Sequence, residues 1–170
     1  MTGTFVITQG EHHATDARDA TISTILGSCV ACCLWDPVAR VGGMNHILLA
    51  ITPNCPDMTP SLTAMNAMEL LINDMLKLGA FRRRLLAKAF GGASMISGLS
   101  EIGAANGTFL LNYLEREGIE CVSQSLGGAR ARHIVFTPAT GAVRMKLTGQ
   151  VVPEEVVRPK VDAGNGLEMF

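Results

Sequence analysis

Short runs of apolar and β-branched residues, separated by turn residues, predict that most of this chain folds into strands. In the segment 142–147 the pattern alternates strictly. Val143 and Met145 are apolar while Arg144 and Lys146 are charged, so one face should be buried and the other exposed. The predicted strands, about eight in all, are 5–8, 21–26, 30–35, 41–51, 85–90, 119–124, 133–137 and 142–147.

Two longer segments repeat their apolar residues at helical spacing. The segment 61–78 carries a methionine-rich stripe and is followed by Gly79, and the segment 101–117 is followed by Gly118. Helices packed on a mixed, largely antiparallel sheet form an α+β fold. The polar stretch 9–19 interrupts the strand pattern and is expected to be a loop.

The composition fits one compact domain. Of the 170 residues, 48% are hydrophobic and 17% are charged, which is enough apolar material for a single core. Apolar patterning fades after residue 149. We therefore expect a domain over residues 1–150 and a loosely ordered tail over residues 151–170.

Charge and cysteine usage narrow the functional classes. The net charge of −1 gives no basis for bulk capture of nucleic acid or anionic lipid. The first residues lack the basic start and apolar core of a signal peptide, and no apolar run approaches the roughly 20 residues that span a bilayer. Five cysteines are a poor disulfide framework. We expect a cytoplasmic protein with no nucleic-acid partner and no membrane insertion.

One cysteine lies in a setting suited to chemistry. Gly27 and Ser28 break a strand immediately before Cys29, so the backbone can turn sharply and present the thiol beside free N–H groups. Such donors lower the pKa of a thiol and can hold an oxyanion. Gly27, Ser28 and Cys29 are therefore the candidate nucleophile turn.

His46 is the best-placed proton acceptor for this thiol. If the strands 30–35 and 41–51 are antiparallel neighbours joined through residues 36–40, the start of one lies opposite the end of the other. Cys29 and His46 would then meet across the pair and form a nucleophile–base dyad. The alternative is that the two residues are incidental.

The remaining histidines and the C-x-x-C pair give weaker indications of a functional site. His133 lies in an apolar strand and is expected to be structural, while His12 and His13 are expected to be solvated. Cys29 and Cys32 form a C-x-x-C pair, as redox and zinc sites do. In a strand, however, positions i and i+3 point to opposite faces. No second pair completes a zinc site, so we expect no metal and no cofactor.

Three glycine pairs could suggest phosphate binding, but none matches a nucleotide-binding fingerprint. They are expected instead to allow tight turns and close backbone approach around one cleft. The candidate cleft residues that follow from two of these pairs are Gly91, Gly92, Ser94, Gly127 and Gly128. The third pair, Gly42-Gly43, is expected to kink a strand or form a bulge.

The segment LGSCVACCLWDPVARVGGMNHILL resembles the signature of the CheD family, the chemoreceptor glutamine deamidases of bacterial and archaeal chemotaxis. The likeness extends, in the family's order, over roughly residues 3–150. The later matching pieces are Gly91–Met95, Ile102–Ala104 with Asn106, Gly127-Gly128 with Arg130 and Arg132, and the turn Thr140-Gly141.

The resemblance implies a Cys-His-Thr hydrolase triad on an α/β sandwich similar to the catalytic domain of cytotoxic necrotizing factor toxins. Cys29 and His46 match the nucleophile and the base. The family's threonine lies six positions before the cysteine, where this chain has Ser23, with Thr21 and Thr24 close by. Ser23 is therefore the expected third member, since its hydroxyl can orient His46.

The function implied by the resemblance is deamidation of glutamine side chains on the cytoplasmic helices of chemoreceptors, through a cysteine thioester and without a cofactor. A CheC-type phosphatase is a further expected partner. One alternative is a non-catalytic binding module that regulates such a phosphatase or the receptors. Another is a broader thiol amidase, esterase or transglutaminase-like enzyme that acts on small amides.

Overall fold

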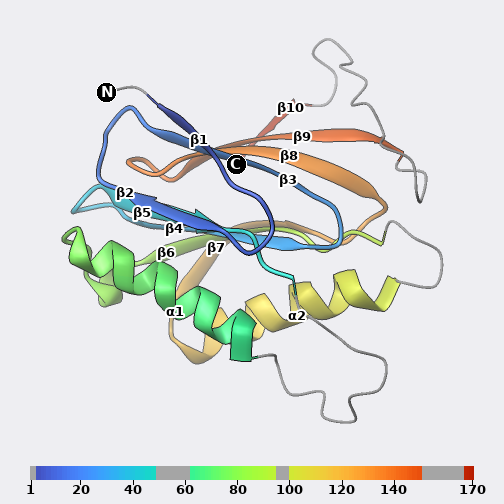
Figure 1. Cartoon of the computed structure of the whole chain (residues 1–170), viewed down its shortest axis with the longest axis horizontal. Coiled ribbons are helices and arrows are strands. Elements are labelled where there is room, and N and C mark those ends of the chain that lie inside the picture. Colours follow the sequence, from blue (N-terminus) through green and yellow to red (C-terminus); the bar gives the residue numbers. More distant parts are fainter. Residues whose placement is uncertain (1–2, 49–61, 95–99, 151–166) are drawn as a thin grey trace.

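The computed structural model describes residues 3–48, 62–94, 100–150 and 167–170. Within these residues the strands form two five-stranded sheets that stack on each other, and two helices lie on one of them. Figure 1 shows the resulting three layers, with the two sheets above and the helices below.

The outer sheet has the strand order β1-β3-β8-β9-β10. Its strands are β1 (Thr4–Val6), β3 (Thr21–Leu26), β8 (Arg130–Thr137), β9 (Ala142–Gln150) and β10 (Leu167–Met169). All neighbours are antiparallel except β1 and β3, which are parallel.

The central sheet has the strand order β2-β5-β4-β6-β7. Its strands are β2 (His12–Thr15), β5 (Val41–Asn45), β4 (Val30–Asp36), β6 (Leu86–Gly91) and β7 (Glu120–Leu126). Here too one pair, β6 with β7, is parallel and the others are antiparallel.

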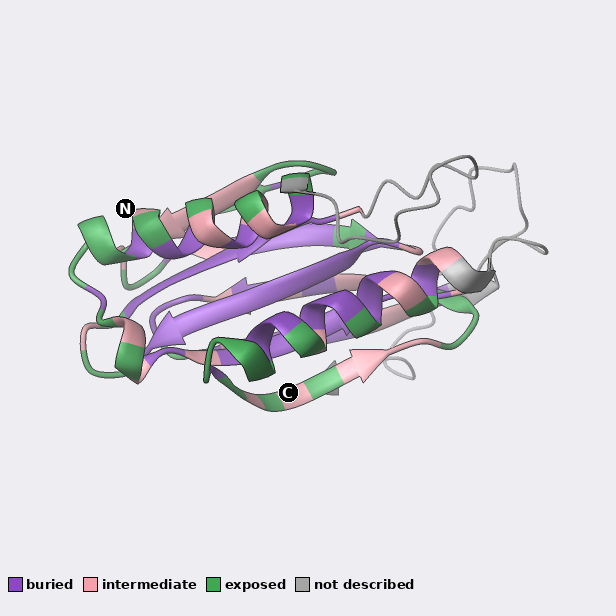
Figure 2. Cartoon of the chain, turned by 90° about the horizontal axis from the view of Figure 1, so that it is seen from below, coloured by how far each residue is buried: buried purple, intermediate pink, exposed green. Residues whose placement is uncertain are grey.

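Helices α1 (Leu62–Lys77) and α2 (Ser100–Arg116) cover the face of the central sheet that is turned away from the outer sheet, and a short 3₁₀ helix, η1 (Arg82–Arg84), precedes β6. Each helix turns a buried stripe to the sheet and an exposed stripe outward (Figure 2). Met68, Ile72 and Met75 are fully buried in α1, as the predicted methionine stripe requires.

The central sheet is buried on both faces, so the molecule has two cores. Ile22, Leu26, Phe136 and Met145 of the outer sheet pack against Phe90 of the central sheet. On the other face, β4 and β6 pack against the apolar stripes of both helices. Burying both faces explains why the strand residues 30–35 are apolar without alternation.

The sequence predicts the α+β class, both helices and most of the strands, and the structure confirms them. The structure differs from the predicted single mixed sheet because its strands are divided between two sheets. The predicted loop over residues 9–19 is wrong, because His12–Thr15 form edge strand β2 along β5. A polar edge strand lacks the apolar run on which strand prediction depends.

Two smaller predictions also need correction. Gly42 and Gly43 lie in regular register with β4, so there is no bulge. Gly42 instead admits the backbone of Pro138, whose carbonyl oxygen would lie 2.7 Å from a Cβ atom at this position. In the predicted tail, residues 151–166 lie outside the described residues, while Leu167–Met169 pair with β9 and the Phe170 ring packs on Phe90.

Candidate active site

The turn Gly27-Ser28-Cys29 joins β3 of the outer sheet to β4 of the central sheet, so it bridges the two layers. Cys29 is 9% exposed and belongs to the core between the sheets. Its thiol therefore lies at the margin of an apolar layer and remains slightly accessible.

His46 follows β5 and lies on the same face as Cys29. A backbone bridge pairs Val30 with Ile47, in the register that pairs Cys33 with Met44 farther along. In this register Cys29 and His46 are diagonal neighbours across an antiparallel pair, a relationship that typically separates residues by about 7–8 Å. The predicted placement of Cys29 and His46 at facing ends of adjacent antiparallel strands is thus what the structure shows.

The hydroxyl of Thr24 orients His46. Thr24 Oγ1 lies 2.7 Å from His46 Nδ1 and donates its proton to the carbonyl oxygen of Ile7, also at 2.7 Å. A hydroxyl has one proton, so at His46 the Thr24 oxygen must accept. Nδ1 therefore carries the imidazole proton, and Nε2 is left as the acceptor nitrogen.

The assignment of Ser23 as the orienting hydroxyl is wrong. Successive residues of a strand point to opposite faces, and Thr24 points inward with Ile22 and Leu26 whereas Ser23 points to the outer face. There Ser23 Oγ lies 2.8 Å from Nε2 of His133. His133 thus has a structural partner, as expected for a histidine in an apolar strand.

Burial sets the resting protonation of the dyad. It raises the pKa of the Cys29 thiol above its ordinary value. It also lowers the pKa of His46, against a smaller opposing effect of the Glu11 carboxylate. Near neutral pH these shifts favour a thiol at Cys29 and a neutral imidazole at His46, the forms that general-base activation of a thiol requires.

Each of the three carbonyl groups of the turn Gly27-Ser28-Cys29 accepts a hydrogen bond. The carbonyl of Gly27 accepts from Ala93 N at 3.0 Å, and that of Cys29 accepts from Gly92 N at 2.8 Å. The carbonyl of Ser28 accepts from Asn106 Nδ2 at 2.6 Å. This arrangement fixes the planes of three successive peptides.

Two of the predicted glycine pairs meet beside this turn. Gly127 N donates to Gly91 O, and Ser94 N donates to Gly128 O. Gly91 has φ +110°, and a Cβ atom there would lie 2.2 Å from the carbonyl oxygen of Cys29. The pair Gly42-Gly43 lies elsewhere, beside the opposite end of β4. A substrate-binding role for residues 91–94 and 127–128 stays a prediction.

Arg132 ties these loops to the outer sheet. It is 5% exposed, and its guanidinium donates to Gly91 O at 3.2 Å, to Gly127 O at 2.7 Å and to Ser125 Oγ at 3.1 Å. Because it projects from β8, it connects both glycine loops to the sheet that carries Thr24.

The C-x-x-C pair does not bring its two sulfurs together. Cys29 belongs to the core between the sheets and Cys32 to the core under the helices, so their side chains lie on opposite faces of β4. Among the described residues, no group of three His, Cys, Asp or Glu side chains is placed to hold a metal ion. No helix in the described part of the chain is long and apolar enough to cross a membrane.

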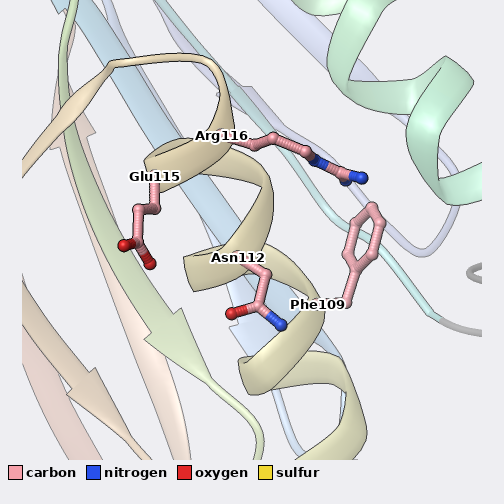
Figure 3. A pocket seen from close by; sticks show the side chains of 4 residues that line it. All are labelled: Phe109, Asn112, Glu115 and Arg116. Carbon is pink, nitrogen blue, oxygen red and sulfur yellow. The ribbon is translucent and has the colours of Figure 1, made fainter.

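A surface hollow lies apart from this site. It is lined by Phe109, Asn112, Glu115 and Arg116, whose side chains project from the C-terminal half of α2 (Figure 3). Asn106, by contrast, contacts the nucleophile turn from the N-terminal half of that helix. None of the predicted site residues lines the hollow.

Sequence reasoning favoured Ser23 and left Thr24 only as an alternative, and it missed the roles of Asn106 and Arg132. A signal for Asn106 was present, since it interrupts the apolar stripe of α2 between Ile102 and Phe109 and is fully buried. A buried amide on an apolar stripe must find a hydrogen-bond partner.

A slightly accessible thiol, an imidazole with an acceptor Nε2 and a hydroxyl that fixes the tautomer are the groups that thiol hydrolases use. The comparisons with known proteins then identify the family. The model of the family described as CheD chemotactic sensory transduction matches residues 51–147.

Relatives extend the match over the nucleophile turn. A protein from Caulobacter vibrioides (strain NA1000 / CB15N) is 48% identical over 158 residues, which cover 90% of this chain and 83% of that protein. One from Cereibacter sphaeroides (strain ATCC 17023) is 48% identical over 162 residues, covering 94% and 81%. One from Acidiphilium cryptum is 50% identical over 145 residues, covering 83% and 76%. All three are named probable chemoreceptor glutamine deamidase CheD, and this chain belongs to the CheD family.

One solved structure has a weaker similarity to this chain. The crystal structure of a Neisseria meningitidis protein of the family DUF152 matches 69% of this chain and 53% of its own, with a TM-score of 0.44 and 10% identity. Likeness at that level carries no argument about the site.

Proposed function

We propose that this protein is a chemoreceptor glutamine deamidase in which Cys29 is the nucleophile, His46 the base and Thr24 the residue that orients His46. The observation that carries the proposal is the pair of hydrogen bonds at Thr24, which leaves His46 Nε2 as an acceptor on the face of the sheet that bears Cys29. Family membership supports the substrate, since the relatives bear the name of this activity.

In the first half-reaction His46 Nε2 takes the proton of Cys29, and the sulfur bonds to the carboxamide carbon of a glutamine side chain. The carbonyl oxygen becomes an oxyanion beside the N–H groups of Ser28 and Cys29. The imidazolium then gives its proton to the leaving nitrogen, the carbon–nitrogen bond breaks, and ammonia departs from a thioester.

In the second half-reaction His46 takes a proton from water, and the resulting hydroxide bonds to the thioester carbon. The carbon–sulfur bond breaks, and the sulfur recovers a proton from the imidazolium. The products are a glutamate side chain and free enzyme. Each turnover consumes one water, releases one ammonia and adds one negative charge to the receptor at neutral pH.

The test is incubation of the protein with a cytoplasmic chemoreceptor fragment, followed by mass spectrometry of its glutamine residues. Cys29→Ala and His46→Ala should abolish conversion to glutamate. Cys32→Ala is the matched control, because Cys32 lies three residues farther along, in β4, and faces the other core. Conversion that continues in Cys29→Ala would contradict the proposal.

A cytoplasmic location and binding of a CheC-type phosphatase belong to the same proposal. Their support is the family, whose named substrates are chemoreceptors. Co-purification with a CheC-type protein from the same cells tests the second point. A stable complex combined with no turnover by the wild-type protein would favour the non-catalytic binding module.

A further inference from the structure

A fully buried amide on α2 contacts the backbone next to the proposed nucleophile. Asn106 is 0% exposed, and its Nδ2 donates to the carbonyl oxygen of Ser28 at 2.6 Å. The carbonyls on either side, those of Gly27 and Cys29, accept instead from backbone N–H groups of the 91–93 loop. Asn106 thus differs from the other two donors in reaching this turn with its side chain.

The direction of the Ser28 carbonyl determines the direction of the Cys29 N–H. In a planar trans peptide, the N–H of a residue points away from the carbonyl of the residue before it. Because Asn106 holds Ser28 O toward α2, the Cys29 N–H points away from the helix. Within the described residues, no acceptor contacts the N–H of Ser28 or Cys29.

Close packing holds the helix against this loop. A Cβ atom at Gly103 would lie 2.4 Å from Ala93 O and 2.6 Å from Gly92 O. Gly103 is one turn before Asn106 on α2, so the absence of a side chain there lets the helix backbone approach the loop that holds the other two carbonyls.

We propose that Asn106 is a positioning residue that fixes the Ser28–Cys29 peptide, so that the Cys29 N–H faces the oxyanion formed when the Cys29 thiol attacks a carbonyl carbon. The proposal rests on the proposed function for its natural substrate. The geometry itself applies to any acyl transfer to Cys29.

Two reactions of the Cys29 thiol distinguish an effect on oxyanion stabilisation from an effect on the general reactivity of the thiol. Acylation of Cys29 by p-nitrophenyl acetate passes through an oxyanion, whereas alkylation by iodoacetamide is a displacement at carbon that forms none. Asn106→Ala should slow acylation by about 10²-fold, the loss typical of one oxyanion donor. It should leave alkylation close to the wild-type rate. Rates are corrected by subtracting those of Cys29→Ala, which removes reactions at other cysteines.

Asn106→Asp provides a second readout. Its carboxylate is an acceptor and repels Ser28 O, whereas its protonated form has an O–H that can donate to Ser28 O. The acylation rate of Asn106→Asp relative to wild type should therefore rise as the pH falls, while that of Asn106→Ala should not. Asn112→Ala and Asn112→Asp, on the exposed side of the same helix, are the matched controls.

The outcomes separate the two proposals. Equal slowing of acylation and alkylation in Asn106→Ala would show a general structural role and overturn the inference. So would an unchanged acylation rate, or no acylation of Cys29 in the wild type. Wild-type protein that acylates Cys29 with the expected dependence on Asn106, yet leaves receptor glutamines unconverted, would overturn the proposed function alone.

Discussion

The hydroxyl of Thr24 lies 2.7 Å from Nδ1 of His46, and its own proton is committed to the Ile7 carbonyl. The main chain that follows β1 therefore selects the tautomer of a histidine on the other sheet. An interaction that spans both sheets in this way requires the sandwich to be fully assembled before the base is correctly oriented.

Replacement of this hydroxyl tests its role. Thr24→Val keeps the shape but removes the acceptor for Nδ1–H, so kcat for receptor deamidation should fall by about 10²-fold, within the range that general-base catalysis contributes. Thr24→Ser should retain most of the activity, and Ser23→Ala should stay close to wild type. A severe loss in Ser23→Ala with a mild one in Thr24→Val would restore Ser23 as the orienting residue.

The pH dependence follows from the burial of His46. Its neutral form is the base, and burial lowers its pKa below the ordinary value of 6.5. The acid limb of kcat/KM should therefore lie below pH 6.5, with the rate falling as the pH decreases through the lowered pKa. An acid limb above that value would contradict the assignment of His46 as a buried base.

The acid limb of the kcat/KM profile should also depend on the charge of Glu11. Its exposed carboxylate raises the pKa of His46, in opposition to burial. Glu11→Gln should shift the acid limb to lower pH, and high salt should shift the wild-type limb in the same direction because it screens the charge. The measurement is the pH profile of kcat/KM for both proteins, and a shift to higher pH in the variant would count against the interaction.

Glycine at position 91 is required by its conformation and by contact with the nucleophile turn. Gly91→Ala places a Cβ atom 2.2 Å from Cys29 O at φ +110°, so it should displace the turn and reduce both activity and stability. Gly127→Ala is the matched control, because Gly127 has φ +85° but no atom within 4 Å of the added Cβ. Gly127→Ala should lower the free energy of unfolding by only about 1–2 kcal/mol, the cost of a left-handed backbone conformation for a residue with a Cβ atom. Urea unfolding and deamidation rates of both variants provide the comparison.

The buried carboxylate of Asp36 should make stability depend on pH. Asp36 is 0% exposed and accepts from Arg84 Nε and from the N–H groups of Val38, Ala39 and Phe81. Burial raises its pKa, but the bonds from Arg84 and the three N–H groups outweigh burial and bring the pKa below its ordinary value of 3.8. Its contribution is therefore present above that value and is lost as the pH falls through the lowered pKa.

Removal of this charge provides the measurement. Asp36→Asn should lower the free energy of unfolding by about 2 kcal/mol at neutral pH, as expected for hydrogen bonds to a charged group. The difference from wild type should shrink in strongly acidic solution. Asp74→Asn, at a carboxylate with a 43% exposed side chain, should have a smaller effect in the same urea titrations. A difference for Asp36→Asn that does not depend on pH would contradict the argument.

The relation between Cys29 and His46 could be predicted because a short hairpin leaves little freedom in register. Strands β4 and β5 are joined through Asp36 and the residues after it, and Asp36 pairs with Val41. Once the hairpin closes, the residues at its open ends must be neighbours. Local sequence therefore determines this part of the site.

The third residue could not be predicted, because both faces of β3 carry apolar side chains. Ile22 and Leu26 are buried with Thr24, but Ile25, beside Ser23, is apolar and 60% exposed. Alternation alone does not say which face of such a strand is inward, and the answer depends on how the outer sheet packs on the central sheet. Strand β2 was missed for a related reason, since its pairing with β5 and the His12–Asp74 contact are long-range.

Strand β4 is buried on both faces along its whole length and is hydrogen-bonded to β5 and β6. Amide protons in such a strand exchange with solvent only when the whole protein opens. The strand that begins directly after the proposed nucleophile is therefore among the last to lose its structure on heating. Thermal loss of activity should coincide with global unfolding rather than precede it.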